Sequence, residues 1–280
     1  DGGRYRTSYA KPERIQQLKS HPTLRFNLPE PLGYRGPADL PALSMDAVTF
    51  RYPPRPGVVT RTDSGSAPLL SGLTVQLGLS SRVAIVGENG AGKTTLVSLI
   101  SGALAPSSGE VHRHHSLRVA TVSQHQTERL RHQLDKTAVQ FMMEALGSAR
   151  ESIKQQDVLN HLGSFGISGD LAALPIGMLS GGQKARLTLA QTMWARPHVL
   201  ILDEPTNHLD SDALEALQVG IGSFKGGLIA ISHSADFVAS FCKELWILER
   251  GHVGVHHIGC LADFEAAFSQ YSNRIIGEFE

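Results

Sequence analysis

Nine residues, 87–95, have the types and spacing of a phosphate-binding loop. They read GENGAGKTT and fit the P-loop pattern G-x-x-x-x-G-K-[ST]. Glycines without Cβ let the backbone adopt positive φ and approach a ligand closely. Backbone amides of the loop and of a following helix would cradle phosphate, while Lys93 brings a charge to the β/γ-phosphates and Thr94 offers a hydroxyl to Mg²⁺. The candidate nucleotide-binding residues here are Gly87, Glu88, Asn89, Gly90, Ala91, Gly92, Lys93, Thr94 and Thr95.

Two carboxylates follow a second apolar run further along the chain. Val199–Leu202 predicts a buried strand, with Asp203 and Glu204 at its carboxyl end. Asp203 is a hard oxygen ligand suited to Mg²⁺, in part through water. Glu204 stands one residue on, where it can polarise an attacking water. An isolated Asp-Glu pair is more often a helix-capping pair, but the glycine loop in the same chain favours the catalytic interpretation.

Two more polar residues follow predicted strands. Gln124 comes after the strand predicted at 117–122 and offers an amide to Mg²⁺ or to the attacking water. His233 comes after the strand predicted at 228–231, where it can donate a hydrogen bond to a γ-phosphate oxygen and orient Glu204. Groups of this kind position reactants and stabilise charge, which is most of what phosphoryl transfer requires.

The elements that must position these residues alternate between strands and helices, which favours an α/β fold with a mainly parallel, covered sheet. A strand is predicted before the glycine loop and a helix after it. Other predicted strands are 43–50, 73–77 (able to run antiparallel to the first) and the hairpin of 245–248 with 253–255. Other predicted helices are 137–146, 152–162, 183–195 (ended by Pro197) and 261–271.

Composition and charge divide the chain further. Residues 1–40 are rich in proline and basic residues and predict a linker outside the core, residues 41–272 the domain, and 273–280 a tail. The chain has zero formal net charge, no apolar run long enough to cross a membrane and no signal peptide. It also lacks an initial Met, and for this reason we treat it as a fragment. Its two cysteines, Cys242 and Cys260, are too few for a disulfide framework and indicate a reducing compartment, the cytosol or an organelle interior. Of these two we expect a cytoplasmic location.

Taken together, the motifs resemble the nucleotide-binding cassette of the ABC ATPases over roughly residues 42–270. The glycine loop is followed by LSGGQ at 179–183, which resembles the family signature, and by VLILDE at 199–204. The resemblance implies a P-loop RecA-like core with an antiparallel β subdomain and a helical signature subdomain at about 125–196. It also implies ATP as substrate, Mg²⁺ as cofactor and hydrolysis of ATP to ADP and phosphate.

The resemblance assigns further roles. Tyr52 resembles the aromatic residue that stacks on adenine, because Phe50 better fits the buried face of its strand. Leu209 and Asp210 resemble the D-loop. The signature motif faces the γ-phosphate held by a partner cassette, so the active unit contains two cassettes and closes on ATP. The residues implied to make that contact are Ser180, Gly181, Gly182 and Gln183.

Within this family the chain resembles the ABC-F branch. The run DEPTNHLD at 203–210, GGQKAR at 181–186 and the proline-rich FNLPEP at 26–31 are similar to the second cassette of an ABC-F protein with the end of its basic interdomain linker. This implies a first cassette N-terminal in the same protein and no direct membrane insertion. It further implies action on the ribosome, with rRNA and tRNA nearby, in translation or ribosome assembly.

Three alternatives stay open. One is the motor subunit of an ABC membrane transporter, whose cassettes carry similar motifs. Another is a relative of the fungal elongation factor three, which Ser234–Phe237 after the histidine resembles, although residues 124–179 are too few for the insert of those proteins. The third is an ATP-gated clamp that does not hydrolyse, against which the intact Lys93, Asp203, Glu204 and His233 argue.

Overall fold

The fold was analysed in a computed structural model. It describes residues 24–37, 40–53, 67–123, 130–146, 153–205, 209, 211–232, 234–259, 263–267, 269 and 271. Three predicted site residues, Gln124, His233 and Asp210, lie outside the described residues, as do residues 1–23 and the predicted tail. In the described part of the chain, no helix combines the length and the apolar character that crossing a membrane requires.

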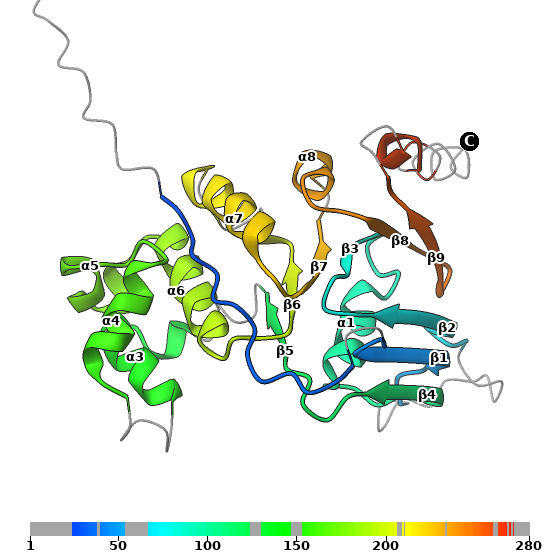
Figure 1. Ribbon diagram of the computed structural model, residues 1–280, viewed down its shortest axis with the longest axis horizontal. Helices are drawn as coiled ribbons and strands as arrows, with labels where there is room; N and C mark the ends of the chain where they lie inside the picture. Colours follow the sequence, from blue (N-terminus) through cyan, green and yellow to red (C-terminus); the bar gives the residue numbers. More distant parts are fainter. Residues whose placement is uncertain are drawn as a thin grey trace, which may run out of the picture.

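Two sheets carry the fold (Figure 1). The smaller one is antiparallel and has the order β2-β1-β4, so the predicted antiparallel pair is confirmed and gains a third strand. The larger one has the order β5-β6-β7-β3-β8-β9. Its first five strands run parallel and β9 returns antiparallel to β8 as the predicted hairpin. The strands are β1 (Leu43–Phe50), β2 (Leu70–Leu77), β3 (Arg82–Gly87), β4 (Ser108–Arg113), β5 (Val119–Val122), β6 (Val199–Asp203), β7 (Gly227–Ile231), β8 (Glu244–Glu249) and β9 (His252–His257).

The helices flank the larger sheet and build a separate lobe (Figure 1). Helix α1 lies beside the antiparallel sheet, and α7 and α8 lie beside the parallel strands. The lobe at the other side holds α3 to α6 and is the predicted helical subdomain. The helices are α1 (Lys93–Ser101), α3 (Ala138–Ala145), α4 (Gln155–Gly163), α5 (Asp170–Ala173), α6 (Gly181–Trp194), α7 (Ser211–Ser223) and α8 (Ala235–Ala239), with short 3-10 turns η1 (Leu130–His132) and η3 (Ile176–Met178).

Side-chain alternation along the buried strands divides the core into two clusters. In β3, Val83 and Ile85 pack with α1 and the antiparallel sheet, whereas Ala84 and Val86 pack with the helices on the opposite face. In β6, Ile201 joins the first cluster and Leu202 the second. Because successive side chains of a strand point to opposite faces, a continuous apolar run can bury both faces at once. The predicted covered, parallel sheet follows from this.

The segment 24–37, here called the lead-in segment, crosses from the helical lobe to β1 without regular structure (Figure 1). Its Phe26 and Leu28 are 3% and 5% exposed and belong to the core, so the prediction that residues 1–40 stay outside the core is wrong for these two. Phe26 packs against Phe165, with ring centroids 5.6 Å apart. Further along, Leu32 O accepts hydrogen bonds from the Arg118 guanidinium and from His198 Nε2.

Helix boundaries and three helices differ from the prediction. Helix α6 begins at Gly181 rather than Gln183, because Ser180 caps it from outside. Helix α4 begins at Gln155, three residues later than predicted. Helices α5, α7 and α8 were not predicted, and α7 contains two glycines that weaken the helical signal.

Candidate nucleotide-hydrolysis site

The phosphate loop joins β3 to α1 and leaves the start of that helix open. Gly92 is the N-cap residue of α1 with φ +106°, and no side chain caps the helix. Gly90 has φ +86°. Both conformations favour glycine, because glycine has no Cβ that could clash with the backbone at positive φ. The uncapped amides of the first turn and the positive end of the helix dipole form a site suited to an anion.

Gly87 is needed for a different reason. It does not have positive φ, but a Cβ there would lie 2.7 Å from the backbone oxygen of Leu248 on β8. Gly87 and Leu248 are paired in the parallel sheet, so that oxygen is held in place by the ladder. The first glycine of the motif therefore permits close packing of the loop's supporting strand.

Lys93 bends back into the loop. Its ammonium donates to the carbonyl oxygens of Gly87, at 2.6 Å, and Glu88, at 3.0 Å. Partial burial lowers the pKa of Lys93, and the carboxylates of Glu204 and Asp203 oppose that shift. The three charged side chains are thus close enough to interact, which gathers a cation and two carboxylates at one edge of the sheet.

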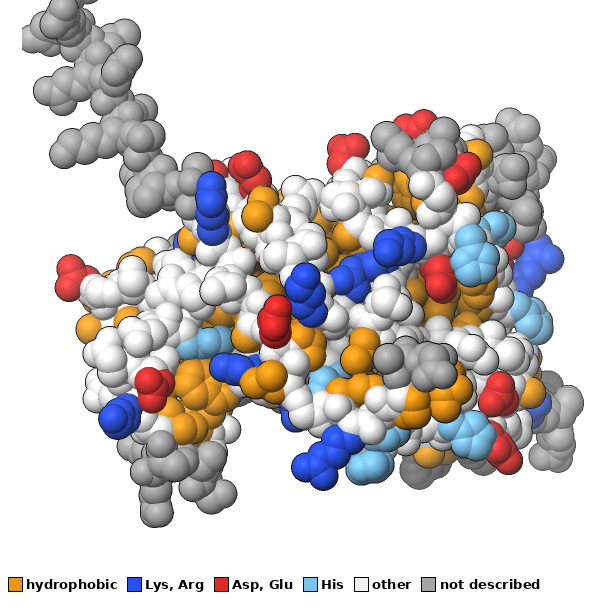
Figure 2. Space-filling view, in the orientation of Figure 1, with side chains coloured by type: hydrophobic (Ala, Val, Ile, Leu, Met, Phe, Trp, Pro, Cys, Tyr) orange, Lys and Arg blue, Asp and Glu red, His pale blue; other side chains and the backbone are white. Residues whose placement is uncertain are grey.

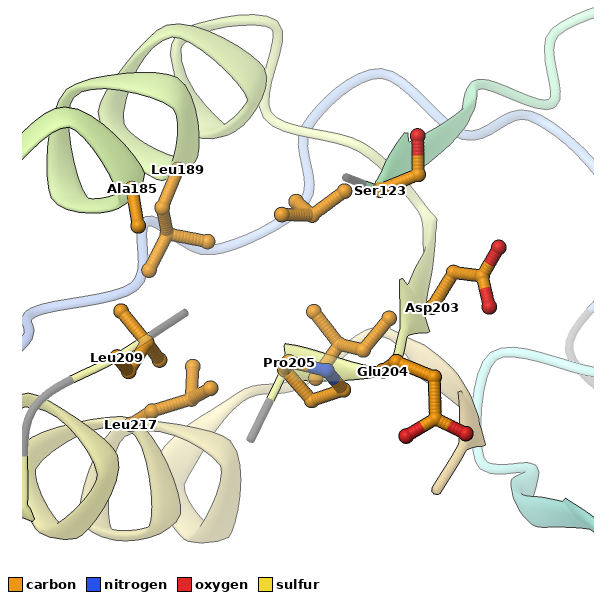
Figure 3. Close-up of a pocket in the computed structure, with 10 residues that line it drawn as sticks. Ser123, Ala185, Leu189, Asp203, Glu204, Pro205, Leu209 and Leu217 are labelled. Atoms are coloured by element: carbon orange, nitrogen blue, oxygen red, sulfur yellow. The ribbon is translucent and has the colours of Figure 1, made fainter. Parts of the chain in front are cut away.

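The two carboxylates come from the end of β6. Asp203 pairs with Ile231 of β7, and the Glu204 amide donates to the Ile231 carbonyl at 2.9 Å. Glu204 has φ +50°, in the left-handed region that a residue with a side chain seldom adopts. This turn ends the strand and points the two carboxylates in different directions (Figure 3), and no sequence pattern predicted it.

Tyr52 lies at the mouth of the loop. Its hydroxyl and that of Thr95 are 2.9 Å apart, and its ring meets that of Phe50 edge-on, with centroids 4.9 Å apart. Phe50, the last residue of β1, is buried, whereas Tyr52, which lies beyond the end of the strand, is 54% exposed. Tyr52 therefore offers an accessible aromatic face beside the phosphate loop.

The signature motif forms the start of α6. Ser180 Oγ accepts from the Gln183 amide at 3.2 Å, and Gln183 Oε1 accepts from the Ser180 amide at 2.8 Å. This reciprocal capping box fixes the helix start. Gly181 follows with ordinary φ, and a Cβ there would meet no atom within 4 Å. Neither strain nor crowding within the described chain explains a glycine at this exposed helix position.

A small apolar cavity connects the signature helix to the end of β6 (Figure 3). Its volume is about 30 Å³. Leu189 and Ala185 of α6 face Leu217 of α7 and Leu209 across it, while the carboxylates of Asp203 and Glu204 point away (Figure 3). Leu209, which is predicted to belong to the D-loop, therefore lies between the signature helix α6 and helix α7 (Figure 3).

This architecture and site define an ABC ATPase cassette. The family described as "ABC transporter" matches residues 70–207, which run from β2 through the phosphate loop and signature motif past the carboxylates. The chain belongs to this ATPase family.

More particularly, the chain is a cassette of the ABC-F type. It is 38% identical over 251 residues to "ABC transporter F family member 3" of Arabidopsis thaliana, covering 90% of this chain and 32% of that protein. It is 40% identical over 232 residues to "ATP-binding cassette sub-family F member 3" of Homo sapiens, covering 82% and 29%. The chain thus spans about a third of the length of these curated relatives.

Solved structures share the fold. The ATP-binding subunit of an ABC transporter matches with a TM-score of 0.61 and 18% identity, over 81% of this chain and 93% of that one. A dimeric ATP-binding cassette in a post-hydrolysis state, bound to ADP and phosphate, matches with a TM-score of 0.60 and 18% identity, over 77% and 98%.

Proposed function

We propose that this cassette binds MgATP at the phosphate loop and hydrolyses it when a second cassette closes over the nucleotide. The observation that carries this proposal is the convergence of Lys93, Asp203 and Glu204 beside the open start of α1. A fixed cation, a helix terminus and two carboxylates supply the charge stabilisation and the water activation that phosphoryl transfer needs.

The residues of the site fit Mg²⁺ as well as the phosphates. The hydroxyl of Thr94 and the carboxylate of Asp203 are hard oxygen donors, which Mg²⁺ prefers, and Gln124 would add an amide oxygen. The metal ion would neutralise charge on the β- and γ-oxygens. Lys93 would hold the same phosphates, and Glu204, oriented by His233, would accept the proton of the attacking water. The ring of Tyr52 would stack on adenine.

The signature motif supports the need for a partner. Gly181 has open space where its Cβ would be, at the exposed positive end of a 14-residue helix. We infer that this space admits the γ-phosphate held by another cassette, to which the amides of Gly181 and Gly182 would donate. Ser180 Oγ accepts the capping bond from the Gln183 amide, so its O–H would still be able to donate to the same phosphate.

We further propose that the partner lies N-terminal in the same protein and that the pair acts on the ribosome. The relatives are about three times as long as this chain and leave room for a first cassette. The basic residues that precede the lead-in segment suit rRNA or tRNA, and a location in the cytoplasm accords with that partner. Closure on ATP would permit binding and hydrolysis would drive release.

The experiment uses the full-length protein with Glu204→Gln and the matching change in the other cassette. Loss of a general base lowers turnover by about 10²- to 10⁴-fold, so the variant should stay closed on ATP and sediment with ribosomes. Glu215→Gln, on the exposed face of α7, is the matched control and should behave as the unmodified protein. A variant that is inactive yet sediments free of ribosomes with ATP present would refute the ribosomal role and leave the ATPase assignment standing.

A transporter motor subunit is the second candidate, favoured by the family description and by the transporter subunit that shares the fold. It predicts co-purification with a membrane protein that docks on the helical lobe. Recovery of the full-length protein with rRNA, without any membrane protein, would exclude it.

A further inference from the structure

We propose that a row of basic residues at the amino ends of the parallel strands binds the phosphate backbone of RNA. The row consists of Arg118, Arg196, Lys225 and Lys243. It lies at the opposite edge of the sheet from the phosphate loop, so it does not serve ATP. The inference rests on the proposed ribosomal function and adds a contact surface to it.

Each residue of the row stands just before one strand. In sheet order, Arg118 precedes β5, Arg196 precedes β6, Lys225 precedes β7 and Lys243 precedes β8. Because strands lie about 4.8 Å apart, the four steps from β5 to β8 give a row about 19 Å long. The four residues follow one another along the sheet in the same order as along the chain, and β3 lies between β7 and β8.

Backbone hydrogen bonds tie these strand starts together. The His198 amide donates to Arg118 O and the Gly227 amide donates to His198 O, each at 2.8 Å. The Lys243 amide donates to Arg82 O at 2.8 Å. The guanidinium of Arg82 donates to Phe224 O and Gly226 O, each at 2.6 Å, and so holds the backbone on both sides of Lys225. The cations are therefore carried by a rigid edge of the sheet.

All four side chains are exposed, and among the described residues none forms an ion pair. In the view of Figure 2, Lys and Arg side chains lie across the middle of the molecule, with fewer Asp and Glu side chains between them. Of the nearby acids, Glu244 is half-buried and accepts a hydrogen bond from Trp246 Nε1 at 3.2 Å, whereas Glu30 of the lead-in segment is exposed. The exposed Arg25 and Arg35 of the same segment add further positive charge.

Neither composition nor helix stabilisation accounts for the row. The chain has 26 basic and 26 acidic residues, so one sign gathers here without an overall excess. Arg196 and Lys225 each lie two residues past a helix, α6 and α7, where a cation complements the helix dipole. Arg118 follows no helix and Lys243 lies four residues past α8. Single cations repeated along a line match single charges repeated along a nucleic-acid backbone.

The test measures binding of the 280-residue chain to a fluorescently labelled 20-nucleotide single-stranded RNA by anisotropy, across a salt series. Lys225→Gln with Lys243→Gln removes half of the row. Arg131→Gln with Lys154→Gln removes the same charge from exposed sites in the helical lobe and is the matched control. Each single-strand phosphate contact adds about 0.7 to the salt slope, or about fivefold in affinity at 0.1 M salt.

We therefore expect the row variant to bind about 25-fold more weakly at 0.1 M salt, with a slope smaller by about 1.4. The control should change by less than about threefold, and Lys225→Arg with Lys243→Arg should restore binding. Equal losses in both glutamine variants, or an unchanged slope in the row variant, would overturn the inference. Competition by polyglutamate as strong as by unlabelled RNA would also overturn it, in favour of an acidic protein.

The two experiments distinguish refutation of the RNA-binding row from refutation of the proposed ribosomal function. If the closed Glu204→Gln protein sediments with ribosomes while the row variant keeps its RNA affinity, only the row is refuted. If the row variant loses affinity while the closed protein sediments free of ribosomes, the RNA surface stands and the ribosomal partner is refuted. Thermal unfolding of the row variant within about 3 °C of the unmodified chain shows that the fold is intact.

Discussion

The backbone strain at Glu204 can be tested by comparing two substitutions, because glycine at this position should make the chain more stable than alanine does. Its φ of +50° places a Cβ close to a carbonyl oxygen, which costs about 1–2 kcal/mol for a residue with a side chain. Glycine avoids this cost but loses about 0.4–1 kcal/mol through the greater freedom of the unfolded chain. Glu204→Gly should therefore be about 0.5–1 kcal/mol more stable than Glu204→Ala. Both variants lose the carboxylate and its contacts, so the comparison isolates the backbone.

The assay is urea unfolding of the 280-residue chain without nucleotide, followed by circular dichroism. The matched control is Glu215, exposed in the interior of α7, where glycine should be about 1 kcal/mol less stable than alanine. The expected result is a reversal of sign between the two positions. Glu204→Ala equal to or more stable than Glu204→Gly would refute the claim that the backbone here is strained. Both Glu204 variants should lose turnover in the full-length protein, because both lack the carboxylate proposed to accept the proton of the attacking water.

Three further outcomes are expected. Gly87→Ala forces a Cβ against Leu248 O, 2.7 Å away, and should destabilise the chain by about 1–3 kcal/mol and weaken binding of a fluorescent ATP analogue, so unaltered binding would contradict the packing role. Phe26→Ala should lower the free energy of unfolding by about 3–5 kcal/mol, because its ring is buried in the core. A change below about 1 kcal/mol would show that Phe26 does not contribute to the core. Burial lowers the pKa of His198, so the folded chain holds this side chain neutral. As pH falls below about 6.5, His198 becomes protonated in the unfolded chain first, and the free energy of unfolding decreases. Unfolding free energy measured from pH 7 to 5 should therefore fall more steeply in the unmodified chain than in His198→Asn, and parallel curves would count against this role.

Local patterns were enough to predict the phosphate loop and every strand except β4. The runs that became β3, β6 and β7 are continuous and apolar, and such runs are buried in a covered sheet. The start of α3 was also predicted, and the structure shows that Thr137 and Gln140, three residues apart, form a capping box there. These features depend on residues close in sequence, so no long-range contact was needed.

Other features depend on contacts between distant residues. Gly87 fits the motif, but its steric reason is an oxygen on β8, and the strand that supplies it lies about 160 residues later. The lead-in segment has the composition of a linker, yet Phe26 enters the core because α7 offers room there: a Cβ on Gly220 would meet Phe26 O at 3.0 Å. No local pattern contains this information.

Residue type and short spacing are enough to show that the chain carries a phosphate loop, a signature motif and two carboxylates at a strand end. Which of these groups meet depends on long-range packing, which turns Glu204 into the left-handed region and brings both carboxylates close to Lys93. It also aligned Arg118, Arg196, Lys225 and Lys243, which are scattered over 126 positions of the chain, along one edge of the sheet. Strand order and register are set by packing across the whole core, and only they convert scattered charges into a surface.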